Sequence, residues 1–97
     1  MAGKVIINNN KIFFMTNEAI AKFVESTSKA KEHVKISFKK RGTVVGHFVQ
    51  SKDYNDLKSK NFWRIVVEPH IDAWKKSNDI NLAKIFNGME ITKLTAV

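Results

Sequence analysis

The stretch HVKISFKKRGTVVGHFVQ, residues 33–50, decides the fold. In its first part the apolar residues Val34, Ile36 and Phe38 are separated by polar ones, and this two-residue period predicts a strand with one buried face. Basic residues and a glycine follow at 39–42 and predict a turn, because glycine takes a positive φ without strain. The chain then returns, so the stretch predicts two antiparallel strands joined by a basic turn.

Further strands extend this pair. Residues 43–50 form the returning strand, in which Gly46 predicts a bulge or a sharp bend of the kind that small barrels need. Residues 62–67 are aromatic and β-branched on both faces, which predicts a central strand covered on both sides. Pro69 should end that strand, because proline has no N–H for the hydrogen-bond ladder.

The C-terminal part predicts a final pair of strands. Residues 82–86 and 91–97 are the two strands, and Asn87 and Gly88 supply a tight turn between them. Five short strands with glycines at two turns and one mid-strand bend predict a strongly bent antiparallel sheet that closes into a small β-barrel.

The N-terminal part predicts a hairpin and a helix. At residues 4–15 two apolar runs are separated by asparagines, which is typical of a hairpin. Residues 16–31 predict a helix that Thr16 or Asn17 caps, since the apolar side chains follow the helical period.

Two connections remain between the strands. Residues 51–61 are polar and predict a loop, with one helical turn at residues 54–57 as the alternative. Residues 70–77 predict a short amphipathic helix. Trp63 in the central strand and Trp74 on this helix can stack on bases, but core packing is the favoured interpretation for both.

The length of 97 residues suits one domain of the α+β class. In this domain residues 1–15 are a hairpin extension, residues 16–31 a helix and residues 33–97 a small barrel. The absence of cysteine excludes a disulfide scaffold and thiol catalysis, and fits the reducing cytoplasm. The apolar runs are far shorter than the roughly 18 residues of a membrane span, so we expect no membrane partner.

The chain carries 17 Lys and Arg against 9 Asp and Glu, a formal net charge of +8 at pH 7. Such a field attracts polyanions, so nucleic acid is the first partner class indicated. Only Arg41 and Arg64 are arginines, and lysine acts as a point charge, whereas base readout favours the planar arginine fork. The alternative is that the lysine-rich composition reflects nucleotide bias of the source.

The sequence shows little of the chemistry that enzymes or metal sites need. His33, His47 and His70 lie too far apart for any recognised ligand spacing. Asp53 and Asp56 could form an acid and base pair, but solvated turn residues are the favoured interpretation. No phosphate-cradling or nucleophile-elbow glycine motif occurs. We expect no enzyme activity, no metal and no cofactor.

Cations gather in two segments, residues 39–41 and residues 52–60. In the second, the ring of Tyr54 could stack on a base while neighbouring ammonium groups meet phosphates. The first is either an anion contact or a solvated hairpin tip. The residues predicted on these grounds to contact nucleic acid are Lys39, Lys40, Arg41, Lys52, Tyr54, Lys58 and Lys60.

Two segments carry a resemblance to a known family. Residues 85–94 (IFNGMEITKL) fit the second motif of the Sm-like (Hfq and LSm-type) small β-barrel family, and its first motif resembles residues 34–55. Over residues 17–97 the chain therefore resembles that family. The resemblance implies an RNA-binding barrel that forms rings through its edge strands. It places Asp53, Tyr54, Asn55, Asn87 and Gly88 near a uracil-binding pore.

The first functional hypothesis is a non-enzymatic protein that binds RNA or single-stranded nucleic acid through lysine-rich loops, because no predicted helix suits a duplex groove. The alternative is a protein-interaction or assembly module, without nucleic acid. Such a module uses a sheet edge, as a homo-oligomer or with a protein partner, or apolar surface around Ile71 and Trp74. Without rings, the fold is a monomeric SH3-like barrel.

Overall fold

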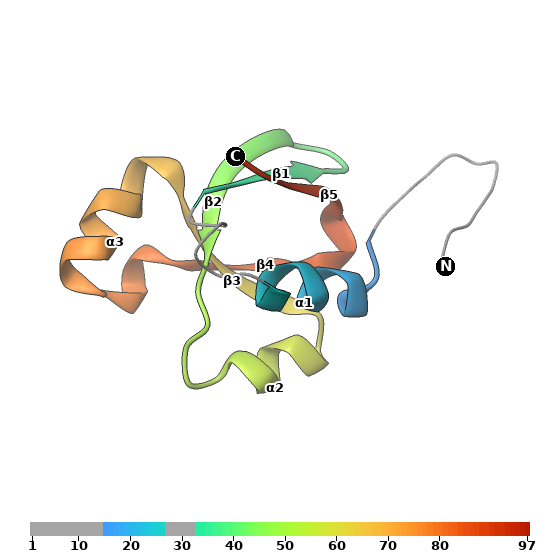
Figure 1. The fold of residues 1–97 in the computed structure, drawn as a ribbon, viewed down its shortest axis with the longest axis horizontal. Helices are drawn as coiled ribbons and strands as arrows, with labels where there is room; N and C mark the ends of the chain where they lie inside the picture. The colour runs from blue at the N-terminus through green and yellow to red at the C-terminus, as the bar shows by residue number, and fades with distance from the viewer. Residues whose placement is uncertain (1–14, 27–32) are drawn as a thin grey trace, which may run out of the picture.

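The computed structural model describes residues 15–26 and 33–97. The hairpin predicted at residues 4–15 lies outside these ranges except for residue 15, and so does the predicted helical stretch at residues 27–31. The helices are α1 (Asn17–Ser26), α2 (Tyr54–Ser59) and α3 (Ile71–Ser77), with 3-10 helices η2 (Glu68–His70), η3 (Ile80–Leu82) and η4 (Gly88–Glu90). The strands are β1 (Val34–Phe38), β2 (Gly42–Phe48), β3 (Phe62–Val67), β4 (Lys84–Asn87) and β5 (Ile91–Ala96) (Figure 1).

The described strands form one antiparallel sheet in the order β4-β3-β2-β1-β5. The prediction of an α+β fold with five antiparallel strands is confirmed. The sheet is not closed, because β4 and β5 are its two edges and do not pair. The predicted closure into a barrel and the predicted hairpin of the last two strands are therefore wrong.

The connection between β4 and β5 explains the missing hairpin. The side-chain oxygen of Asn87 accepts a hydrogen bond from the backbone N–H of Met89 at 2.9 Å and caps η4. A 3-10 turn, instead of a two-residue hairpin turn, then leads the chain to the opposite edge of the sheet, where β5 pairs with β1. The predicted strand at residues 82–86 also starts later, at Lys84, because Asp79 caps η3 through Asn81 N–H.

Gly46 marks the point where β2 passes from one neighbour to the other. It lies opposite Val34 of β1 and opposite Val67 of β3, and neither register shifts there. The prediction of a bulge is thus wrong, whereas Figure 1 shows the predicted bend along β2. A Cβ at Gly46 would lie 2.7 Å from Cγ2 of Ile65, so close approach of three strands requires glycine here.

The inner face of the sheet carries the main core. Val34, Ile36 and Phe38 point to it, as their alternation predicted, and each is at most 6% exposed. Ile20 and Val24, one helical turn apart on α1, pack into the same cluster. A fully buried Ile contributes about 1.5–3 kcal/mol. The two α1 side chains therefore help to cover the inner face of the sheet.

The outer face has a second, smaller core at β3. Trp63 and Ile65 point inward, whereas Val66 points outward and is 0% exposed. This confirms the prediction that residues 62–67 form a strand covered on both sides. The outward cluster is Val49, Val66, Ile71 and Ala83, with Trp74 partly buried against it. Pro69 ends the strand and α3 follows, as predicted.

Residues 51–61 are not the predicted loop, because Tyr54–Ser59 forms α2. The local pattern of apolar residues does not predict this helix clearly, because none of the residues of α2 is fully buried. Its stability comes from tertiary contact: the Tyr54 ring packs against Trp63 at 6.0 Å between centroids. Asn61 ends the segment at a φ of 62°. Among residues 15–26 and 33–97, no helix has the length and apolarity to cross a membrane.

Candidate nucleic-acid interface

The predicted contact Tyr54 is engaged inside the protein. Its hydroxyl donates a hydrogen bond to Oε2 of Glu25 on α1 at 2.6 Å, and its ring faces Trp63. Burial, and then the bond to Glu25, raise the pKa of Tyr54. The hydrogen bonds from Tyr54 and then from Lys58 lower the pKa of Glu25, so the carboxylate is ionised. Both the hydroxyl and the ring of Tyr54 are thus engaged in contacts within the protein.

The neighbouring cations of α2 are also paired. Lys58 Nζ lies 3.0 Å from Oε2 of Glu25 and 5.4 Å from the centre of the Tyr54 ring. Lys60 Nζ lies 3.4 Å from Oδ2 of Asp56. These pairs are partly exposed and so weak, but they lower the positive potential of this segment. Of the three lysines predicted around Tyr54, Lys58 and Lys60 thus have acidic partners, and Lys52 is exposed.

Asp53 has a structural role at the start of α2. Its carboxylate accepts hydrogen bonds from Ser51 and from the guanidinium of Arg64 on β3. The bond from Ser51, and then those of Arg64, lower the pKa of Asp53. Lys52 and Asn55 beside it are exposed. Three of the residues that the resemblance placed near one pore, Asp53, Tyr54 and Asn55, thus lie at the start of α2.

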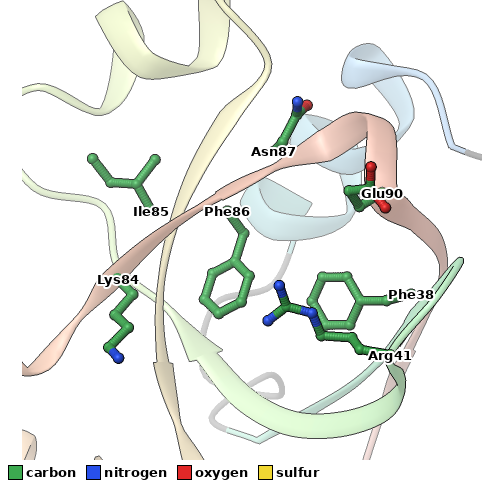
Figure 2. Close-up of a pocket in the computed structure, with 7 residues that line it drawn as sticks. All are labelled: Phe38, Arg41, Lys84, Ile85, Phe86, Asn87 and Glu90. Atoms are coloured by element: carbon green, nitrogen blue, oxygen red, sulfur yellow. The ribbon is translucent and has the colours of Figure 1, made fainter.

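Asn87 and Gly88 are likewise used by the fold. The Asn87 side chain caps η4 and points to the side of β4 opposite Phe86 (Figure 2). Gly88 is buried, and its N–H donates to the carbonyl of Asn61 at 2.8 Å. A Cβ there would lie 2.7 Å from Trp63 Nε1 and closer still to the Asn61 amide. Gly88 is therefore a packing residue.

The basic turn between β1 and β2 remains accessible. Lys39, Lys40 and Arg41 are exposed, and Gly42 has the predicted positive φ, 78°. The backbone N–H of Lys39 donates to the carbonyl of Glu90 at 2.8 Å, which holds the turn against η4. Its three cations are consecutive and exposed, and the guanidinium of Arg41 turns toward the rings of Phe38 and Phe86.

Next to the turn, the outer face of β1 and β5 carries further lysines that sequence reasoning missed. Lys35 lies opposite Thr95, and Lys93 lies opposite Ser37, so the two lysines are diagonal neighbours on one face, about 7–8 Å apart at Cα. Both are exposed. The alternation in β1 pointed Lys35 away from the core, but only the β1–β5 register brings Lys93 beside it.

The carboxylates of the described residues lie on other elements. They are Glu18 and Glu25 on α1, Asp53 and Asp56 at α2, Glu68, Asp72 and Asp79 around α3, and Glu90 on η4. The polar neighbours of the two lysines on the outer face are instead hydroxyls, since Ser37 and Thr43 lie 3.3 Å apart there. Among the residues that the structure describes, neither Lys35 nor Lys93 takes part in an ion pair.

A pocket of about 270 Å³ lies between the basic turn and β4. Arg41 lies over two rings, with its guanidinium carbon 5.2 Å from the centre of Phe38 and 5.4 Å from that of Phe86. Figure 2 shows these three side chains turned toward one another. The lining residues are Phe38, Arg41, Lys84, Ile85, Phe86, Asn87 and Glu90.

Within residues 15–26 and 33–97, no three acidic or histidine side chains gather in a way that could hold a metal ion. Comparisons of the chain with protein-family models, curated proteins and solved structures find no match.

Proposed function

We propose that this protein is a non-enzymatic nucleic-acid-binding protein that holds RNA or another single strand on a basic strip. The strip consists of Lys35, Lys93 and the turn residues Lys39, Lys40 and Arg41. The observation that carries the proposal is that the register of β1 and β5 brings Lys35 and Lys93 side by side on the exposed outer face of the sheet, next to the exposed cations of the adjoining turn.

The chemistry of the strip suits a phosphate backbone. Ammonium groups on a sheet meet successive phosphates and release counterions, which gives affinity without sequence preference. The hydroxyls of Ser37, Thr43 and Thr95 on the same face can donate to phosphate or to sugar oxygens. The described part of α1 carries charges of both signs, Glu18 and Glu25 beside Lys22, which does not suit a major groove, so a single strand is the favoured partner.

The proposed similarity to Sm-like or SH3-like small barrels is supported by the order of the elements, and not by a closed barrel. A helix followed by five bent antiparallel strands is the arrangement on which the resemblance rests. The residues that the resemblance placed near a pore are mostly engaged internally, so the proposed binding uses the strip instead. A cytoplasmic location, where RNA is abundant and thiols are reduced, belongs to the same proposal.

Fluorescence anisotropy with a labelled single-stranded RNA of mixed sequence tests this proposal. The double variant K35E/K93E should weaken binding about tenfold or more at low salt and flatten the salt dependence, since each lost phosphate contact removes about 0.7 from the logarithmic slope. The matched control K52E/K76E changes the net charge equally at exposed sites off the strip. Equal loss in both variants, or no binding at low salt, would overturn the proposal.

The open sheet edges favour a second candidate function, assembly with another chain. Neither β4 nor β5 has a neighbour on its outer side among the described strands, and Ile85 on β4 is 51% exposed. Exposed edges with apolar side chains are sites of strand addition. Sedimentation at several concentrations tests this candidate: an assembly module forms an oligomer that I85K weakens and that persists at high salt.

A further inference from the structure

We infer that the pocket beside Arg41 binds a guanine base. This inference rests on the proposed function for its biological setting, because the pocket opens next to the basic turn of the strip. It goes beyond backbone binding, since a base pocket adds a preference at one position of the strand. Three side chains of its lining can hold a base: Arg41 as a stacking surface, and Lys84 and Glu90 as hydrogen-bonding groups.

Arg41 is a prepared stacking surface. Its guanidinium lies over the rings of Phe38 and Phe86, whose centres are 5.5 Å apart with 30° between the ring planes. Arginine planes held on aromatic rings accept a base on their remaining side. No ion pair holds Arg41 within residues 15–26 and 33–97. Its charge is thus available to a ligand.

Glu90 is the feature that distinguishes a base pocket from a phosphate site. A carboxylate repels phosphate, yet Glu90 lines the same pocket as Arg41 and Lys84. The carbonyl of Glu90 accepts a hydrogen bond from Lys39 N–H at 2.8 Å, which anchors η4 to the basic turn. The carboxylate can only accept hydrogen bonds, so the complementary ligand presents N–H donors on one edge and acceptors on another.

Guanine has this combination. Its N1–H and N2 amino group lie side by side and match a carboxylate, while O6 and N7 are acceptors for a lysine such as Lys84. In adenine and cytosine the amino group stands beside a ring nitrogen that accepts hydrogen bonds, and uracil has one N–H between two carbonyls. The pocket volume of about 270 Å³ is just below the roughly 300–1,000 Å³ of drug-sized sites, which suits one planar base.

Anisotropy with labelled nine-nucleotide RNAs tests the inference. The strands are uridine homopolymers with a single central guanosine, inosine or adenosine. The guanosine strand should bind about tenfold more tightly than the adenosine strand, the size expected for one good bidentate pair. Inosine, which lacks the N2 amino group, should fall between them. E90Q should reduce the guanosine preference to less than about threefold while keeping overall binding.

The control variant is E68Q, which changes an exposed carboxylate on η2 outside the pocket and should keep the guanosine preference. Competition with free guanosine monophosphate tests whether the ligand of the pocket is a base within a strand or a free nucleotide. If the ligand is a free nucleotide, the monophosphate itself should bind tightly. If all strands bind equally, the guanine inference fails and the strip proposal stands. If only the monophosphate binds, the strip proposal fails and the pocket stands. Binding of neither overturns both.

Discussion

The phenolic oxygen of Tyr54 lies 2.6 Å from Oε2 of Glu25, a residue 29 positions earlier in the chain. This hydrogen bond joins α2 to α1, and Lys58 reinforces it by pairing with the same carboxylate at 3.0 Å. The bond bears on the function of α2, because it holds the ring of Tyr54, which the sequence indicated as the candidate for stacking on a base. Its consequences can be measured in stability and in titration.

Replacing Tyr54 with Phe should lower the free energy of unfolding by about 1 kcal/mol, since one hydrogen bond to a partly exposed charged group is lost while the ring stays packed. Urea denaturation measures the change. In a double-mutant cycle with E25Q, the two effects should be less than additive because both variants remove the same bond. Affinity for single-stranded RNA should remain that of the original protein, and a marked loss would return Tyr54 to the binding site.

The tyrosine should titrate at unusually high pH. Tyr54 is the one tyrosine of the chain, and burial followed by the bond to Glu25 raises its pKa above the usual 10.0. The raised pKa means that the contribution to stability is present below pH 10.0 and is lost as the pH rises through the folded-state value. Ultraviolet absorbance should show the midpoint of ionisation above pH 10.0 in the folded chain and near pH 10.0 in the urea-unfolded chain; equal titration of the two would contradict the contact.

Glu25 should make stability fall in acid. The hydrogen bonds from Tyr54 and Lys58 lower its pKa below the usual 4.5. A lowered pKa gives stability that is present above pH 4.5 and is lost as the pH falls through the folded-state value. The variant E25Q should therefore be less stable than the original protein at neutral pH, and the difference should shrink below pH 4.5. Urea midpoints across this range check it, and a constant difference would refute the assignment.

We expect the substitution G46A to lower the stability of the fold more than the substitution G42N does. A Cβ at Gly46 meets Ile65 at 2.7 Å and the Val66 carbonyl at 3.1 Å, so G46A should cost about 1–3 kcal/mol through overpacking. Gly42 has open space and a φ of 78°. Because asparagine tolerates such a φ, G42N should cost less than about 1 kcal/mol. Thermal unfolding of both variants compares them, and equal losses would speak against the crowding at β2.

The structural features that could be predicted from the sequence are those that depend on residues close together in the chain. Alternation at Val34, Ile36 and Phe38 gave the inner face of β1, and the glycine at 42 gave the turn. The local pattern of residues 54–59 left their helix undecided, because contact with Trp63 and Glu25 stabilises it and these partners are distant in the chain.

In the candidate site, too, the sequence predicted the local features and missed those that depend on tertiary contacts. The basic turn was visible in sequence, since its cations are consecutive. The pairing of Lys58 with Glu25 and the neighbourhood of Lys35 and Lys93 were not, because they depend on how α1 packs and on the register between β1 and β5. The wrong prediction of a C-terminal hairpin placed Lys93 next to β4, on the opposite edge from its real neighbours.

The most direct test of the basic strip is a titration of the isotope-labelled protein with a single-stranded RNA, followed in two-dimensional amide NMR spectra. The account predicts that the largest shifts occur at Lys35, Ser37, Lys93 and the turn at residues 39–42, and that α2 and α3 shift little. Largest shifts at Lys58 and Lys60, or small shifts spread evenly over every surface, would contradict it.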